Sequence, residues 1–185
     1  MAIALLAPAL ASAQRADTSA FYRALDLEGS GNYRAAAPLY RTALQGPDRV
    51  NAMLGLERVY AELHQTDSLL VPLDSLIAQN PTEPVFRSVQ LRAYSMLARD
   101  DMVRRSFEDW VKAIPGSADP YREYARLLLQ NGRAVEADSI IRLAGLALGT
   151  TSSLQMELAE SRAALGQQAA SAAEWRGALA ANPDL

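Results

Sequence analysis

The feature that most constrains the fold is a regular spacing of helix-breaking residues. Pro47, Pro81 and Pro115 are evenly spaced at a period of about 34 residues, Pro183 follows after two more such periods, and Gly149 stands at the position between. A helix interior cannot hold proline without losing a backbone hydrogen bond, so each of these residues is expected to end a helical segment. Equal spacing predicts that one supersecondary unit, a helix–turn–helix, repeats along the chain.

Composition supports helices and excludes several classes of function. Half of the 185 residues are apolar and only 6% are aromatic, which favours closely packed helices over a sheet. The formal net charge of -3 provides no basic field, so we expect no nucleic-acid partner. The sequence has no cysteine, which excludes disulfides, thiolate metal ligands and a cysteine nucleophile.

The N-terminus has the pattern of a secretory signal. Residues 3–10 are apolar, and Ala11-Ser12-Ala13 then forms a small-x-small cleavage site before Gln14, although no Lys or Arg precedes the apolar stretch. The stretch is too short to span a bilayer, which needs about 20 apolar residues. We therefore interpret residues 1–13 as a signal peptide and expect a periplasmic or secreted protein. The alternative is a disordered leader or a first helix.

The repeat spacing divides the rest of the chain, residues 14–185, into five blocks. Each contains two helical patterns around a short turn, and the blocks are residues 16–49, 50–83, 84–117, 118–151 and 152–185. In the inner turns, Gly31, Gly132 and Gly166 suit the left-handed conformation that ends a first helix. Side-chain oxygens from Thr66 or Asp67, and from Asp100 or Asp101, are expected to cap second helices.

The blocks also resemble the tetratricopeptide repeat (TPR) family in their residues. The family pattern has a small residue in the first helix, glycine at the turn, and an aromatic with alanine in the second helix. In block five the matching residues are Ala159, Gly166, Trp175, Ala178, Leu179 and Pro183. In block four they are Tyr121, Ala125, Gly132, Ala137 and Ala144. Block one matches when it is shifted by one residue, with Ala24, Gly31, Tyr33, Ala36, Tyr40, Ala43 and Leu44.

In blocks two and three the resemblance rests on Tyr60 and Tyr94, while Glu57 and Leu91 replace the small residue. The resemblance implies an all-α fold, a right-handed superhelix of about five helix pairs, and a bacterial exported protein of the kind that serves envelope processes. Its helix pairs are stable only through contacts between neighbouring repeats.

Leu185 ends the sequence where a polar capping helix would follow in a complete array. We therefore expect either a fragment of a longer protein, which we favour, or a C-terminal face that meets a partner or a second copy. In the second case the protein would associate with itself through this uncapped end.

The side chains that catalysis needs are scarce, so we predict that the protein is not an enzyme and holds no metal or cofactor. His64 is the only histidine and falls in a turn, where a solvated side chain is expected rather than a general base. The sequence contains no phosphate-binding loop. The acidic residues are interpreted as helix caps and solvated faces, with Glu157 and Glu160 among them. Trp110 and Trp175 are expected in the core, or else as a stacking platform for a ligand.

One pattern favours a binding site. Arg58, Arg92 and Arg126 follow one another at the repeat period, each near the middle of a first helix, and Arg122 lies one turn from Arg126. In the family, first helices line the concave groove, so the three arginines (the arginine ladder) would stack along it. Guanidinium groups bind carboxylates in a bidentate manner. We therefore expect an anionic peptide segment, such as a free C-terminal carboxylate, to bind at Arg58, Arg92, Arg122 and Arg126.

The alternative is that these arginines pair with acidic neighbours such as Glu62 or Glu123. The lysines and asparagines of the family's chaperone-binding carboxylate clamp are absent, so that partner is not expected here. The function predicted from sequence is a non-catalytic scaffold or adaptor that binds a protein or peptide in the envelope. The alternative function is an N-terminal regulatory or substrate-docking arm of a larger envelope enzyme.

Overall fold

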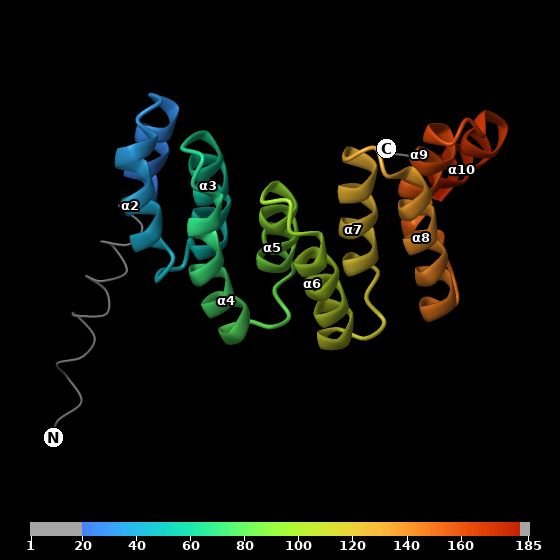
Figure 1. The fold of residues 1–185 in the computed structure, drawn as a ribbon, viewed down its shortest axis with the longest axis horizontal. Helices are drawn as coiled ribbons and strands as arrows, with labels where there is room; N and C mark the ends of the chain where they lie inside the picture. Colours follow the sequence, from blue (N-terminus) through green and yellow to red (C-terminus); the bar gives the residue numbers. More distant parts are fainter. Residues whose placement is uncertain (1–19, 182–185) are drawn as a thin grey trace, which may run out of the picture. The chain divides into compact units, whose positions relative to one another are not determined.

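The computed structural model describes residues 20–181, and this part of the chain is helical without β-strands. The chain divides after Ala98 into two compact units, unit 1 up to Ala98 and unit 2 from Arg99 (Figure 1). The predicted signal peptide, Pro183 and Leu185 lie outside the described residues. Within residues 20–181, no helix combines the length and the apolar character that a membrane span requires.

Unit 1 begins with a helix at residues 20–29, which continues to α2 (Tyr33–Ala43) across a short turn. The next pair consists of α3 (Arg49–Glu62) and α4 (Leu70–Gln79), joined by the 3-10 turn η1 (Thr66–Leu69), and α5 (Pro84–Met96) follows. α2 packs on α3, while α5 packs on both α3 and α4. A helix therefore contacts its neighbours in sequence and also the first helix of the next repeat.

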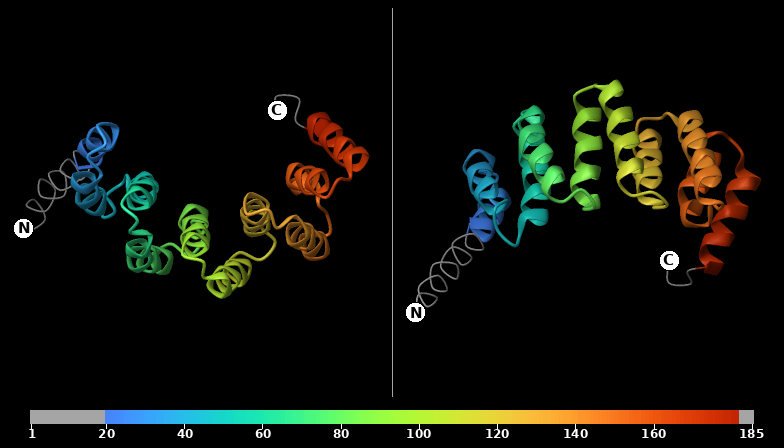
Figure 2. Two further views of the ribbon diagram at one scale, coloured as in Figure 1. Left: turned by 45° about the horizontal axis from the view of Figure 1, so that its top comes forward. Right: turned by 90° about the horizontal axis from the view of Figure 1, so that it is seen from below.

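Unit 2 contains α6 (Asp100–Ala113), α7 (Asp119–Gln130), α8 (Ala134–Leu148), the turn η2 (Ser152–Leu154), α9 (Gln155–Ala164) and α10 (Gln168–Ala181). Each helix packs on the next from α6 to α10, and α7 also contacts α9 (Figure 2). We use "first helices" for residues 20–29, α3, α5, α7 and α9, and "second helices" for α2, α4, α6, α8 and α10.

The helix-ending residues lie where their spacing predicts. Pro47, Pro81 and Pro115 each fall in the turn after a second helix, and Gly149 is the left-handed C-cap of α8 with φ of 73°. In the inner turns, Gly31, Gly132 and Gly166 have φ of 76°, 72° and 76°, which confirms their left-handed conformation.

Among residues 20–181, two residues other than glycine adopt the same left-handed conformation. His64 has φ of 56° and Ala98 has φ of 53°, and they lie at the inner turns of the second and third repeats. Ala98 stands one repeat period after His64 and one repeat period before Gly132. The repeat therefore imposes this backbone conformation even where the residue carries a Cβ that opposes it.

The expected caps of the second helices were wrong. Neither η1 nor α6 has a side-chain hydrogen bond at its N-cap, because Gln65 and Arg99 occupy these positions. Asp100 instead begins α6, and its carboxylate accepts a hydrogen bond from Arg133 Nη1 at 3.1 Å. The Asp100 carboxylate thus contacts the residue that precedes α8.

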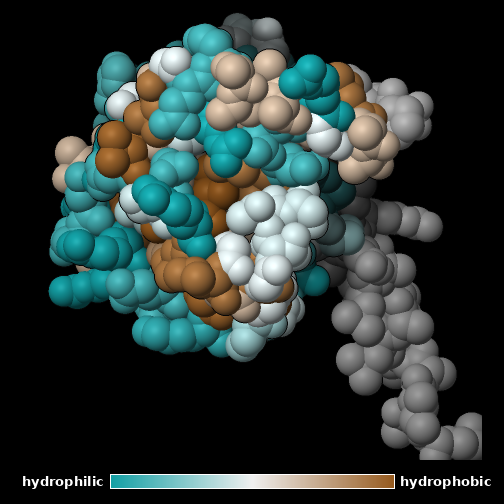
Figure 3. Space-filling view, turned by 90° about the vertical axis from the view of Figure 1, so that its right-hand side faces the viewer, coloured by the Kyte–Doolittle hydropathy of each residue, from teal (hydrophilic) through white to brown (hydrophobic). Residues whose placement is uncertain are grey.

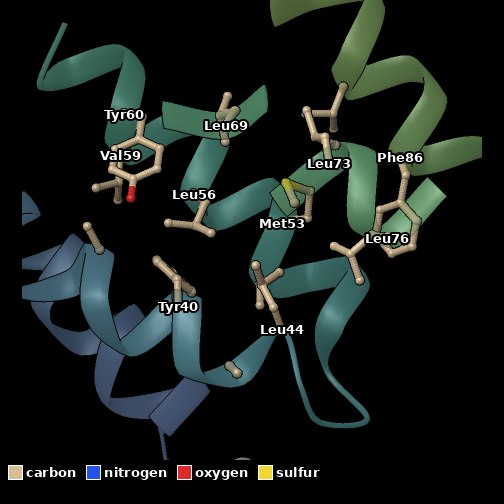
Figure 4. Packing of buried hydrophobic residues seen from close by; sticks show 14 of the residues in the cluster. Tyr40, Leu44, Met53, Leu56, Val59, Tyr60, Leu69, Leu73, Leu76 and Phe86 are labelled. Atoms are coloured by element: carbon tan, nitrogen blue, oxygen red, sulfur yellow. The ribbon is translucent and has the colours of Figure 1, made fainter. Parts of the chain in front are cut away.

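The core of unit 1 is formed by buried side chains from the helix of residues 20–29 and from α2, α3, η1, α4 and α5 (Figure 4). Tyr40 of α2 is fully buried and its ring lies under α3, where Gly55 provides the space. A Cβ on Gly55 would lie 2.4 Å from Tyr40 Cζ, closer than two non-bonded carbons can approach. The aromatic of one repeat therefore requires glycine in the next.

The buried residues of unit 2 include Trp110 of α6. Trp110 is completely buried, which confirms its expected place in the core, whereas Trp175 on α10 is 37% exposed. Phe107 of α6 packs on the rings of Tyr121 and Tyr124 of α7 at centroid distances of 5.4 and 4.9 Å. An aromatic of a second helix thus meets aromatics of the following first helix.

Candidate functional site

The three arginines of the ladder lie on three different first helices, Arg58 on α3, Arg92 on α5 and Arg126 on α7. Each forms an ion pair with a glutamate of an adjacent first helix. Arg58 and Arg92 belong to unit 1, while Arg126 and Arg122 belong to unit 2. The ladder is therefore divided between the two units.

In unit 1, Arg58 closes a network with Glu28 and Tyr40. Arg58 Nε donates to Glu28 Oε1 at 2.6 Å and Nη2 donates to Oε2 at 3.0 Å, while the Tyr40 hydroxyl donates to the same carboxylate. The Arg58 hydrogen bonds lower the pKa of Glu28 below its ordinary value, although burial acts in the opposite direction. Burial, followed by the neighbouring carboxylate, raises the pKa of Tyr40. Glu28 is thus held ionised.

Arg92 forms the second pair of unit 1. Its Nε donates to Glu57 Oε1 at 2.6 Å and its Nη2 donates to Oε2 at 2.8 Å. Glu57 occupies the position where the family pattern has a small residue. The structure gives a reason for the departure, because this carboxylate bridges α3 to α5.

In unit 2, Arg126 pairs with a carboxylate that is inside the protein. Arg126 Nε donates to Glu157 Oε1 at 2.7 Å, and the Glu157 side chain is only 2% exposed. The interpretation of Glu157 as a cap or solvated residue was therefore wrong. The expected partner Glu123 lies 3.7 Å from Arg126, whereas Arg58 pairs with Glu28 rather than with Glu62.

Arg122 is also held by neighbouring groups. Its Nη1 donates to Asp119 at 2.6 Å, and its Nη2 donates to the Ser153 carbonyl at 3.0 Å. This second bond connects the start of α7 to η2. All four arginines predicted for the site thus have carboxylate partners, and their binding role stays a prediction.

Three of the four arginines, Arg58, Arg122 and Arg126, border open depressions. In unit 1, a depression of about 610 Å³ is bordered by Arg58, Leu25, Tyr33 and Glu62. In unit 2, one of about 630 Å³ lies beside Arg126, Leu129 and Glu160, and one of about 330 Å³ lies beside Arg122. Each combines apolar and charged groups, which suits a peptide better than a small ion.

The described residues provide little for catalysis. His64 is exposed at its turn, as expected. Within residues 20–181, no three acidic or histidine side chains are grouped so that they could hold a metal ion. The ion pairs between first helices are formed by guanidinium and carboxylate groups.

Sequence reasoning placed the arginines but missed their partners. The arginines share the repeat period, whereas Glu28, Glu57 and Glu157 lie 30, 35 and 31 residues from their partners. The acidic partners therefore follow no period that could have revealed them. Tyr40 was assigned to the core, and its bond to Glu28 had no signal in the sequence.

Consecutive helix–turn–helix units, with side chains that connect one first helix to the next, define a helical repeat protein. Neither a protein-family model nor a curated protein matches the sequence. Solved structures do match. The chain superposes on the thermophilic TPR protein TTC0263 of Thermus thermophilus with a TM-score of 0.57 and 21% identity, over 91% of this chain and 93% of that one.

Two further similar structures are a tetratricopeptide repeat protein of Parabacteroides merdae and MamA. The first has a TM-score of 0.54 at 10% identity and covers 92% of this chain and 68% of that one. MamA has a TM-score of 0.51 at 13% identity, over 89% and 91% of the two chains. The chain has the tetratricopeptide-repeat fold, which confirms the all-α repeat architecture predicted from the sequence.

Proposed function

We propose that this protein is a non-catalytic interaction module that binds a protein or peptide segment on the face formed by its first helices. The observation that carries this proposal is the set of ion-paired arginines beside open depressions in both units. TPR-like repeats stack into extended surfaces that hold partners.

The arginines are oriented before any partner arrives. A guanidinium has five N–H donors, and the glutamates engage the Nε edge of Arg58 and Arg126. The side chains remain 54% and 42% exposed, so N–H groups are left at the surface. A fixed guanidinium loses little conformational entropy when it binds a second acceptor.

The partner chemistry follows from these donors. A carboxylate of the partner, such as a free C-terminus or an acidic side chain, would accept from the outer guanidinium edge. The apolar side chains beside the arginines, Leu25 and Tyr33 in unit 1 and Leu129 in unit 2, would contact the adjoining residues of the segment. The partner is thus a peptide with a carboxylate next to apolar side chains.

The test is a selection of peptides from a random library displayed on phage, using the whole chain as bait. Dissociation constants of selected peptides are then measured by fluorescence anisotropy for the Arg58→Gln/Glu28→Gln and Arg126→Gln/Glu157→Gln variants. These paired changes remove the guanidinium without leaving a lone buried carboxylate. The matched control is Arg142→Gln/Asp138→Asn, which removes an ion pair from the second helix α8.

We expect affinity to fall by at least about tenfold in the two ladder variants and to stay unchanged in the control. Amidation of the peptide C-terminus should weaken binding where that carboxylate is the bound group. Equal binding by all variants would exclude the first-helix face. Failure to select any peptide would contradict the proposed peptide recognition itself.

We further propose a location outside the cytoplasm. The support is the apolar stretch and the small-x-small site before Gln14 in the sequence. Expression of the whole chain in a bacterium, followed by fractionation and N-terminal sequencing, tests this proposal. A periplasmic product that begins at Gln14 is expected, and an uncleaved cytoplasmic product would contradict it. No observation favours the docking arm of a larger enzyme.

A further inference from the structure

A depression of about 250 Å³ lies in unit 1 between α2 and the end of α3. It shares no residue with the depressions beside Arg58, Arg122 and Arg126. We call it the α2 groove. Its lining comes from one face of α2 and from the last turn of α3, and includes Arg34, Ala37, Pro38, Arg41, Tyr60 and Leu63.

The two arginines of the α2 groove differ from those of the arginine ladder. Arg34 and Arg41 are exposed, and within residues 20–181 neither of them forms an ion pair with a carboxylate. None of the described residues that line the groove is acidic. The groove therefore carries two positive charges that its own lining does not neutralise, and it attracts a negatively charged group.

The spacing of these arginines gives the groove a length. Arg34 and Arg41 are seven residues apart on one face of α2, which corresponds to two helical turns and about 10 Å along the helix axis. Ala37 and Pro38 lie between them on the same face, and their short side chains let another segment approach α2 closely. Leu63 is partly buried beside them and adds apolar contact.

Two further polar groups accompany the groove. Pro38 is an exposed residue inside α2, and because proline has no N–H, the carbonyl of Arg34 receives no helical hydrogen bond from this position. Tyr60 is only 5% exposed, yet its hydroxyl has no hydrogen-bond partner among residues 20–181. Buried hydroxyl groups normally have one. A bound molecule could satisfy both groups.

Exposed apolar surface alone does not distinguish the α2 groove. On the side of the molecule that is on the right in Figure 1, apolar residues also reach the surface between polar ones (Figure 3). The α2 groove differs because a guanidinium group flanks its apolar centre at each end, and these groups determine the charge of the molecule that binds.

We propose that the α2 groove binds an acidic amphipathic helix of a partner protein. The groove face of α2 has arginines seven residues apart with small apolar residues between them. The complementary helix has carboxylates seven residues apart, which pair with Arg34 and Arg41, and apolar side chains between them, which contact Pro38 and Leu63. This site is separate from the proposed peptide site on the first helices and does not depend on it.

The probe is a fluorescein-labelled synthetic helix with two glutamates seven residues apart and two leucines between them. A reference helix has glutamines in place of the glutamates, and both are amidated at the C-terminus. Dissociation constants are measured by fluorescence anisotropy for the whole chain and for its Arg34→Gln/Arg41→Gln variant. The matched control, Arg104→Gln/Arg105→Gln, removes two exposed arginines from the second helix α6. Circular dichroism checks that each variant keeps the helical content of the parent.

We expect the glutamate helix to bind the parent and the control equally, and to bind Arg34→Gln/Arg41→Gln at least about tenfold more weakly. The glutamine helix should bind the parent more weakly by a similar factor. The charge-reversed variant Arg34→Glu/Arg41→Glu should instead prefer a helix with lysines in place of the glutamates. Arg58→Gln/Glu28→Gln should bind the glutamate helix like the parent, which separates this site from the first-helix site.

Four outcomes would overturn the proposal. Equal affinity of the parent and Arg34→Gln/Arg41→Gln for the glutamate helix would place the contact elsewhere. Equal binding of the glutamate and glutamine helices, or binding of neither, would exclude an acidic helix as the occupant. Weaker binding only in Arg58→Gln/Glu28→Gln would assign the probe to the first helices. Binding to phosphatidylglycerol vesicles that needs Arg34 and Arg41, without binding of the helix, would assign the groove to a membrane surface.

Discussion

Glu28 shows how a single carboxylate connects three helices of unit 1. It accepts hydrogen bonds from Tyr40 on α2 and from Arg58 on α3, while it belongs to the helix of residues 20–29. The network joins the buried core to the exposed first-helix face. Its strength depends on the charge of Glu28 and therefore on pH.

We predict that Glu28→Gln destabilises the protein by about 1–2 kcal/mol at neutral pH. The pKa of Glu28 is lower in the folded than in the unfolded state, so its contribution is full above its ordinary value of 4.5 and is lost as pH falls through the folded value. Urea denaturation of parent and variant at pH 7 and at pH 3 checks this. A difference in unfolding free energy that grows toward low pH would contradict the network.

Gly55 is predicted to tolerate no side chain. Gly55→Ala would place a Cβ 2.4 to 2.8 Å from three atoms of the buried Tyr40 ring, and we expect a loss of about 1–3 kcal/mol from overpacking. Gly29→Ala is the control, since a Cβ there meets no atom within 4 Å. Thermal melting curves of the two variants should separate, with only Gly55→Ala melting earlier than the parent.

Ala98 is predicted to carry backbone strain. Its φ of 53° disfavours an L-residue, so Ala98→Gly should raise the unfolding free energy by about 0.5–1 kcal/mol. The reverse change is Gly132→Ala. Gly132 has φ of 72°, and a Cβ there would meet no atom within 4 Å, so the substitution should lower stability through the backbone conformation alone. Both effects are measured from the midpoints of denaturant unfolding curves, provided that the dependence of the unfolding free energy on denaturant concentration is unchanged. A lower stability of Ala98→Gly would contradict the predicted backbone strain at Ala98.

At the scale of helices, the ion pairs between first helices differ in which partner is buried. In the pair of α7 and α9, Glu157 is 2% exposed while Arg126 is 42% exposed. Removal of the arginine leaves a buried charge without its partner, whereas removal of the glutamate charge leaves an arginine that water can solvate. The two substitutions are therefore not equivalent.

We predict that Arg126→Gln costs about 3 kcal/mol and Glu157→Gln only about 1 kcal/mol. The double variant should recover most of the difference, which a double-mutant cycle on urea unfolding measures. Equal losses in the two single variants would indicate that Glu157 is solvated when Arg126 is absent. Arg142→Gln on α8, where the arginine is 71% exposed, should change stability little.

At the scale of the whole molecule, the division into two compact units predicts which helices lose stability after a substitution. In repeat proteins stability comes from contacts between neighbours, so a broken interface affects adjacent helices first. Ala137 of α8 is completely buried in unit 2, where α8 packs on α7 and α9. A large charged residue at this position would separate these helices.

We predict that Ala137→Arg destabilises the protein by about 3–5 kcal/mol through overpacking and a buried charge. Hydrogen exchange followed by mass spectrometry should show faster exchange in α7, α8 and α9 than in α3 and α4 of unit 1. Ala178→Arg on α10 tests the last helix pair in the same way. A melting curve unchanged by either substitution would contradict the repeat register.

Sequence by itself determined the features that depend on local backbone chemistry and on the repeat period. Pro47, Gly132 and Gly149 end helices or turn the chain because of their own conformational preferences, and the constant repeat period places Arg58, Arg92 and Arg126 at equivalent positions. Such signals are read along the chain and do not depend on how the helices pack.

Only the tertiary structure decided which side chains meet across repeats. Glu28, Glu57 and Glu157 reach their arginines from separations that differ each time, and Glu157 is buried although its neighbours in sequence gave no sign of it. Trp110 and Trp175 both belong to second helices, yet one is buried and the other exposed. The physical reason is that burial and ion pairing depend on the helix that packs against a residue, which the residue's own segment does not encode.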